Sequence, residues 1–94
     1  MLIISHQIYL KLISKHGLKE PEREIIEAFS NMTGGTLIDT REEHASDPPM
    51  EWFIAETNQG KMLKVCFIAK QGNIYIRTAY QPNSDEIRIY QKYK

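Results

Sequence analysis

Residues 51–81 contain three apolar segments separated by two short turns, and this pattern constrains the fold more than any other part of the chain. The segments are 52–57, 62–69 and 73–80, and side chains in each alternate as they do in half-buried strands. Gly60 and Gly72 stand in the turns, where a tight hairpin needs a residue with positive φ. The pattern therefore predicts an antiparallel three-strand meander as the core.

Helices are predicted on both sides of the meander in the sequence, over residues 6–16, 21–31 and 85–93, because apolar residues recur there about one turn apart. We expect the first two helices to bury Ile8, Leu12, Ile13, Ile25, Ile26, Ala28 and Phe29. Short strands are expected at 2–4 and 36–39. The sequence predicts one α+β domain over residues 1–94: a small antiparallel sheet of the meander plus one or two further strands, with an N-terminal helix pair and a C-terminal helix on one side.

Residues 40–50 are the least regular part of the chain. Pro48 and Pro49 remove two backbone donors, so we expect an ordered loop or a mobile arm rather than a helix or an inner strand. His44 lies in this segment and is expected to be exposed and to titrate near neutral pH.

The charge of the chain is balanced overall but uneven along its length. Residues 1–50 carry five Lys and Arg against eight Asp and Glu, whereas residues 51–94 carry seven against four. The total of zero does not argue for nucleic acid, although a basic face remains compatible with it. No segment approaches the roughly 18 apolar residues of a membrane span, and the N-terminus lacks the pattern of a signal peptide. We therefore expect a cytoplasmic protein that does not bind membranes.

Strand alternation suggests a candidate site on the sheet. Lys64 and Arg77 are expected to project from the same, less apolar face, with Tyr75 and Glu56 near them. Cations there could neutralise the charge that grows on a phosphodiester during cleavage, and Glu56 or a histidine could act as the general base. The alternative is a solvated face with cross-strand ion pairs.

The remaining reactive side chains have simpler interpretations. His16 is expected to cap the end of the first helix, and His6 to lie on the surface in its first turn. Cys66, the single cysteine, is expected to be an inert core thiol suited to a reducing compartment. No histidine or cysteine pair has the spacing of metal ligands, so no metal and no cofactor are expected.

Several motifs resemble the BrnT-like toxin family. Lys15-His16-Gly17, followed by an acidic helix that ends in Glu27-Ala28-Phe29, is similar to the family's KHG…EA-F opening. The strand at 74–80 resembles its I-R-I-x-x-A strand, with Tyr80 where the family often has arginine, and the helix at 86–93 resembles its tail rich in Glu and Tyr. The similarity spans residues 12–93.

This resemblance implies a RelE-like fold and a metal-independent endoribonuclease that cleaves mRNA. By position it implies Lys15, His16, Arg77 and Tyr90 as site residues, and the strand argument adds Lys64 and Glu56. The complete candidate set is, for catalysis, Arg77, Lys64, His16, Glu56 and Tyr90, and for RNA binding, Lys15, Tyr75, Tyr80 and Arg88.

The resemblance also implies a partner, a DNA-binding antitoxin encoded alongside, and it leaves open whether the chain forms a homo-oligomer. The alternative function is a non-catalytic relative that binds protein through a sheet edge or the loop at 40–50. In that case the Lys and Arg side chains of the sheet would be held in internal salt bridges.

Overall fold

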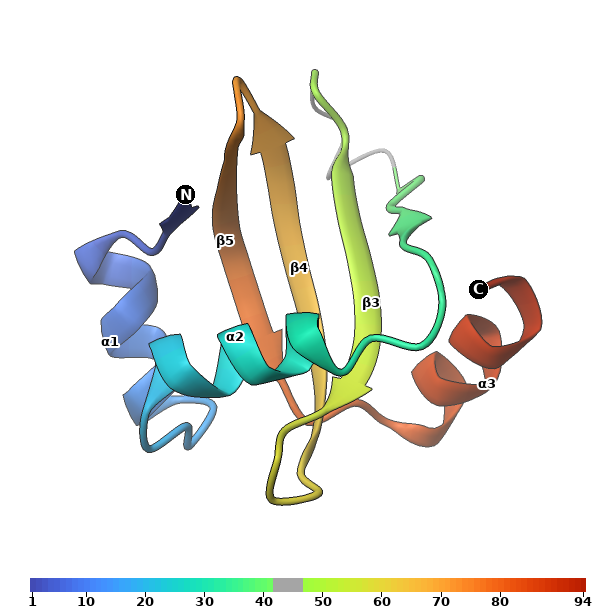
Figure 1. Ribbon diagram of the computed structural model, residues 1–94, viewed down its shortest axis with the longest axis horizontal. Coiled ribbons are helices and arrows are strands. Elements are labelled where there is room, and N and C mark those ends of the chain that lie inside the picture. Colours follow the sequence, from blue (N-terminus) through green and yellow to red (C-terminus); the bar gives the residue numbers. More distant parts are fainter. Residues whose placement is uncertain (42–46) are drawn as a thin grey trace.

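The computed structural model describes residues 1–41 and 47–94. Along the chain the elements are β1 (Leu2–Ile3), α1 (His6–Ser14), α2 (Pro21–Ser30), β2 (Leu37–Ile38), β3 (Met50–Glu56), β4 (Met62–Lys70), β5 (Asn73–Tyr80) and α3 (Ser84–Tyr93) (Figure 1). The α+β class, the meander and the three helices are confirmed. Residues 42–46, and with them His44, lie outside the described residues.

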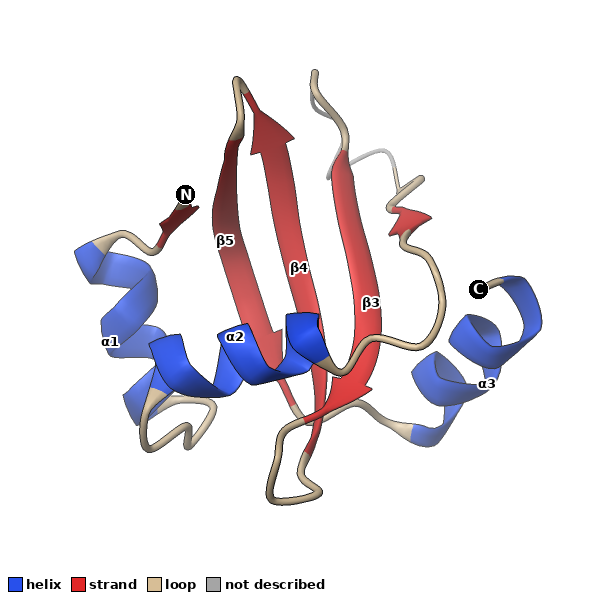
Figure 2. Ribbon diagram, viewed as in Figure 1, coloured by secondary structure: helices blue, strands red, loops and turns tan. Residues whose placement is uncertain are grey.

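The strands form one five-stranded sheet in the order β1-β5-β4-β3-β2 (Figure 2). The central three strands pair antiparallel as the meander predicts, and β2 pairs antiparallel with β3. The edge strand β1 instead runs parallel to β5, with Leu2 opposite Ile74. The expectation of a purely antiparallel sheet is therefore wrong. β1 and β5 are neighbours in the sheet although the helix pair and the first strands of the meander lie between them in the sequence, and they run in the same direction.

The turn between β4 and β5 has the geometry that the glycine predicts. Gln71 and Gly72 both have positive φ, 53° and 81°, and they separate the paired residues Lys70 and Asn73. Two central residues with positive φ match the right-handed twist of the flanking strands. This two-residue turn fixes where the pairing of β4 with β5 begins.

The helices cover both faces of the sheet rather than one, which corrects the expected layering. Phe29 of α2 packs on Phe53 and Phe67, whose rings point to one face, at centroid distances of 4.7 and 5.3 Å. Tyr90 of α3 packs on Trp52, which points to the opposite face, at 5.8 Å. A helix that follows β5 reaches the second face because the chain crosses beneath the meander to the β3 side (Figure 1).

Each N-terminal helix buries a narrower stripe than expected. Leu12 and Ile25 are fully buried, but Ile13 is 42% exposed and Ile26 is 48% exposed. Their neighbours in sequence occupy the buried stripe, and one residue along a helix turns the side chain by about 100°. None of the described helices is long and apolar enough to cross a membrane.

Candidate functional site

A buried charge network lies on the Trp52 face of the sheet. The Lys64 ammonium on β4 is 2.8 Å from Oε2 of Glu86 on α3, and the Tyr80 hydroxyl on β5 donates to the same oxygen at 2.6 Å. Lys64 also lies over the Trp52 ring, 4.4 Å from its centroid. We call Lys64, Tyr80 and Glu86 the Glu86 network.

The start of α3 places the carboxylate of this network. Oε1 of Glu86 accepts from the backbone N–H of Asn83, while the Asn83 side chain accepts from the backbone N–H of Glu86. This reciprocal capping box uses one carboxylate oxygen and leaves the other for the sheet. One side chain therefore caps the helix and also fastens it to β4 and β5.

His16 extends the network to the edge of the sheet. Its ring lies against Tyr80, with the centroids 5.5 Å apart, and its Nε2 is 3.5 Å from Oγ1 of Thr78. It follows the C-cap of α1, Lys15, and precedes Gly17, whose φ of 70° turns the chain away from the helix. The partly exposed His16 imidazole therefore lies where the end of α1 meets β5 and the Glu86 network.

The environment shifts the pKa of every titratable group in this cluster. Burial is the largest single cause and disfavours the charged forms of Lys64 and Glu86, but their mutual hydrogen bond and their hydrogen bonds with Tyr80 together outweigh it, so the pKa of Lys64 is raised and that of Glu86 is lowered. Burial, and then the bond to Glu86, raises the pKa of Tyr80. Burial, and then the charges of Lys15 and Lys11, lower the pKa of His16, which keeps its imidazole neutral near pH 7.

Arg77 does not join Lys64, contrary to the expectation from strand alternation. Cys66 pairs with Thr78 and the next residue, Phe67, pairs with Ile76, so Arg77 is the extra residue of a β-bulge. The bulge reverses the alternation of β5, and the partner of Lys64 on its face is Tyr80. Arg77 is exposed, whereas Lys64 is only 7% exposed.

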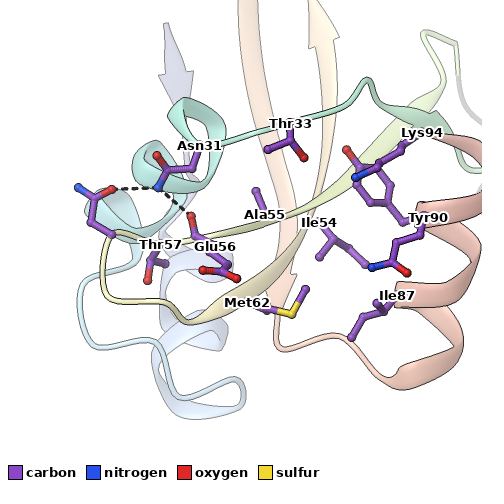
Figure 3. A pocket seen from close by; sticks show the side chains of 12 residues that line it. Asn31, Thr33, Ile54, Ala55, Glu56, Thr57, Met62, Ile87, Tyr90 and Lys94 are labelled. Carbon is purple, nitrogen blue, oxygen red and sulfur yellow. Dashed lines mark hydrogen bonds between the residues drawn. The ribbon is translucent and has the colours of Figure 1, made fainter.

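Glu56 and Tyr90 line a separate hollow of about 540 Å³ beside the outer edge of β3 (Figure 3). Figure 3 shows Glu56 and Asn31 at one end and Tyr90 and Lys94 at the other. Tyr90 is buried, and its hydroxyl donates to the carbonyl oxygen of Gly35 at 2.7 Å. Within residues 1–41 and 47–94, no hydrogen bond or ion pair connects either residue with the Glu86 network.

The RNA-binding candidates are dispersed. Lys15 is exposed beside His16, and Tyr80 lies in the network. Tyr75 is half-buried on β5 opposite Ile68, and Arg88 is exposed on α3, 3.4 Å from Asp85. The structure thus brings together Lys64, Tyr80, His16 and Lys15, with Arg77 next to Thr78 in the chain, and sets Glu56, Tyr90, Tyr75 and Arg88 apart from them.

Cys66 is 3% exposed in the middle of β4. Burial is the main cause that raises the pKa of its thiol, to about 11. This confirms a core thiol. Among residues 1–41 and 47–94, no three His, Cys, Asp or Glu side chains are placed to hold a metal ion.

Sequence reasoning missed Glu86 and Thr78. The spacing of Asn83 and Glu86 is a capping-box signal that could have placed Glu86 at the first turn of α3. Its contact with β4, 22 residues earlier, had no local signal. Regular alternation would place Thr78 on the face opposite Arg77 and Lys64, and only the bulge puts it on the Lys64 face beside His16.

Comparisons with models of known protein families, with curated proteins and with solved structures find no match to this chain.

Proposed function

We propose that this chain is a BrnT-like toxin with a RelE-like fold: an endoribonuclease that cleaves mRNA without a metal in the cytoplasm and is neutralised by an antitoxin partner. The motifs at residues 15–17, 27–29 and 74–80 support the family. The order strand, helix pair, meander and closing helix is compatible with it.

One observation supports the chemistry most. His16 has a lowered pKa and lies partly exposed between Tyr80 and Thr78, so a neutral imidazole is available as a general base. In the proposed reaction His16 removes the proton of a ribose 2′-hydroxyl as that oxygen attacks the adjacent phosphorus. The bond to the 5′-oxygen breaks, the 5′-oxygen takes up a proton from water, the His16 imidazolium later returns its proton to the solvent, and a 2′,3′-cyclic phosphate remains.

The cations that we propose to bind the phosphate are the exposed side chains of Lys15 and Arg77. Lys15 is adjacent in sequence to His16, and Arg77 is adjacent to Thr78. Each of these two cations therefore lies next to one residue of the His16–Thr78 contact. They would neutralise the charge that grows on the phosphate. Lys64 has a different role in this proposal: its ammonium is bound to Glu86, and it positions Tyr80 against His16.

The test is cleavage of RNA by purified protein in EDTA, together with growth after induced expression. His16→Gln is expected to reduce the cleavage rate by about 10²-fold or more, since general bases contribute about that much. Arg77→Ala is expected to reduce it too, while Lys70→Ala, which removes another exposed cation of the meander, leaves it unchanged. RNA left intact at stoichiometric excess of a harmless protein would exclude the proposal.

A second candidate function, a non-catalytic module that binds protein, is favoured by the ion pair of Lys64 with Glu86. This pair removes from the sheet a cation that a nuclease could have used. If wild type and His16→Gln are equally harmless and neither cleaves RNA, this second function is preferred.

A further inference from the structure

The outer edge of β3 is paired over only part of its length. β2 pairs with Trp52 and Glu51, and next to this pairing the Asp39 N–H donates to the Met50 carbonyl at 2.8 Å. No strand of the described chain pairs with the outer edge of β3 beyond Trp52. The last part of the strand therefore has an open edge on the side away from β4.

The backbone groups at this open edge can be assigned. Alternate residues of a strand direct their N–H and C=O to the same side, so those of Ile54 and Glu56 point outward like those of Met50. The Asn31 side chain confirms the direction, because its Nδ2 donates to the Glu56 carbonyl at 2.9 Å. Within the described residues no hydrogen bond reaches the outward N–H and C=O of Ile54. Ile54 is only 5% exposed, and unpaired backbone groups near the interior are costly.

The hollow described above lies at this edge (Figure 3). The segment at residues 31–36 is attached to β3 at both of its ends. The attachments are the hydrogen bond from Asn31 to the Glu56 carbonyl and the pairing of Leu37 with Trp52. The Asn31 amide also donates to Oδ1 of Asn58. The hollow is therefore framed by hydrogen bonds before any ligand arrives, which lowers the cost of binding.

The lining combines an apolar surface with the Glu56 carboxylate at one end and the Lys94 side chain at the other. Ile54, Met62 and Ile87 supply apolar side chains. Glu56 is exposed and forms no ion pair or side-chain hydrogen bond with any described residue. A ligand that fits must offer backbone-like donors and acceptors to Ile54, an apolar group to the walls and a cation to Glu56.

We propose that the hollow binds a short extended polypeptide segment of a partner protein, which pairs with the Ile54 backbone and places an Arg or Lys side chain on Glu56. Extended segments that add to an open sheet edge gain affinity from main-chain hydrogen bonds and specificity from side-chain pockets. RNA fits less well, because the Glu56 carboxylate repels phosphate. This binding site is independent of the proposed nuclease activity.

The test is titration of the 15N-labelled protein with acetyl-Val-Arg-Val-amide, followed by amide chemical shifts. We expect shifts at Ile54, Glu56 and Asn31, and slower hydrogen exchange of the Ile54 amide when the peptide is bound. Acetyl-Val-Gln-Val-amide keeps the backbone and the apolar groups without the cation, and we expect it to bind about tenfold more weakly, since hydrogen bonds between charged groups are stronger than those with a neutral partner.

Two variants complete the experiment. Glu56→Gln is expected to remove the preference for the Arg peptide, whereas Glu22→Gln, which changes an exposed carboxylate on α2, retains it. The proposal is overturned if both peptides bind equally to wild type, if their shifts lie outside the hollow, or if no shift occurs at millimolar peptide. None of these outcomes depends on whether the protein cleaves RNA.

Discussion

Lys64 and Glu86 are 22 residues apart in the sequence, yet their side chains form a 2.8 Å ion pair that joins the middle strand to the first turn of the last helix. Only 8% of the Lys64 side chain and 19% of that of Glu86 are exposed. Breaking a buried pair from one side leaves the other charge unpaired, which is costly.

Glu86→Gln is therefore expected to lower the free energy of unfolding by about 3 kcal/mol. Glutamine can still accept from the Asn83 N–H with its single oxygen, so the cap is kept while the charge and the acceptor of the Lys64 and Tyr80 hydrogen bonds are removed. Urea denaturation measures the change. Asp85→Asn is the matched control: its contact with Arg88 is 3.4 Å long and both side chains are mostly exposed, so the expected loss is about 0.5 kcal/mol or less. Equal losses in the two variants would contradict a structural role for the buried pair.

The same pair predicts a dependence of stability on pH. Because the folded-state pKa of Glu86 is lowered from 4.5, its contribution is present in full above pH 4.5 and is lost as the pH falls through the folded-state value. The difference in unfolding free energy between wild type and Glu86→Gln should therefore shrink from pH 7 to pH 3. Denaturation curves at several pH values measure it, and a constant difference would be inconsistent with the lowered pKa.

The imidazole of His16 should titrate below pH 6.5, because burial and the neighbouring Lys15 and Lys11 disfavour its cation. The unfolded chain binds the proton more readily, so this group contributes stability above pH 6.5 and the contribution declines as the pH falls below that value. NMR titration of the ring protons measures the pKa. His6, exposed in the first turn of α1, provides a second imidazole for comparison in the same spectra. A value for His16 above 6.5 would contradict the neutral base in the proposed reaction.

Cys66 should react slowly with thiol reagents. A pKa of about 11, in place of 9.0, leaves about 100-fold less thiolate at pH 8, and the side chain is also buried. The rate of reaction with a chromogenic disulfide, compared in native buffer and in 6 M urea, measures this. Rapid reaction of the native protein would show that the middle of β4 opens readily.

Tyr90→Phe should cost about 1 kcal/mol of stability, because it removes the hydrogen bond to the Gly35 carbonyl without changing the packing on Trp52. Tyr93→Phe, at a residue that is 62% exposed, should cost little. If the nuclease proposal is correct, cleavage of RNA should survive Tyr90→Phe at temperatures where the variant is folded. Loss of cleavage with unchanged stability would restore Tyr90 as a catalytic candidate.

The local elements were predictable because their signals are local. The strand at Asn73–Tyr80 matches the predicted segment at both ends, since the two-residue turn at Gln71 and Gly72 fixes its start. The first two helices begin at the predicted residues, His6 and Pro21, because the signals there, the Ser5 cap and the proline itself, act within one turn.

The candidate site was predictable only in part. Lys64, Tyr80 and His16 were identified as residues, but their grouping was not, because it depends on which residue of β5 faces β4. One extra residue, Arg77, changes that pairing for the second half of the strand.

By itself the sequence determined the α+β class, the meander and its turns, and where the first two helices begin, because each depends on interactions between residues close in the chain. The tertiary structure alone decided that Lys64 is buried against Glu86, that Arg77 is an exposed bulge residue not paired with β4, and that Glu56 stands at an open strand edge. These relationships depend on strand register and on where α3 returns to the sheet. Both are set by packing between residues far apart in the sequence, which no local pattern records.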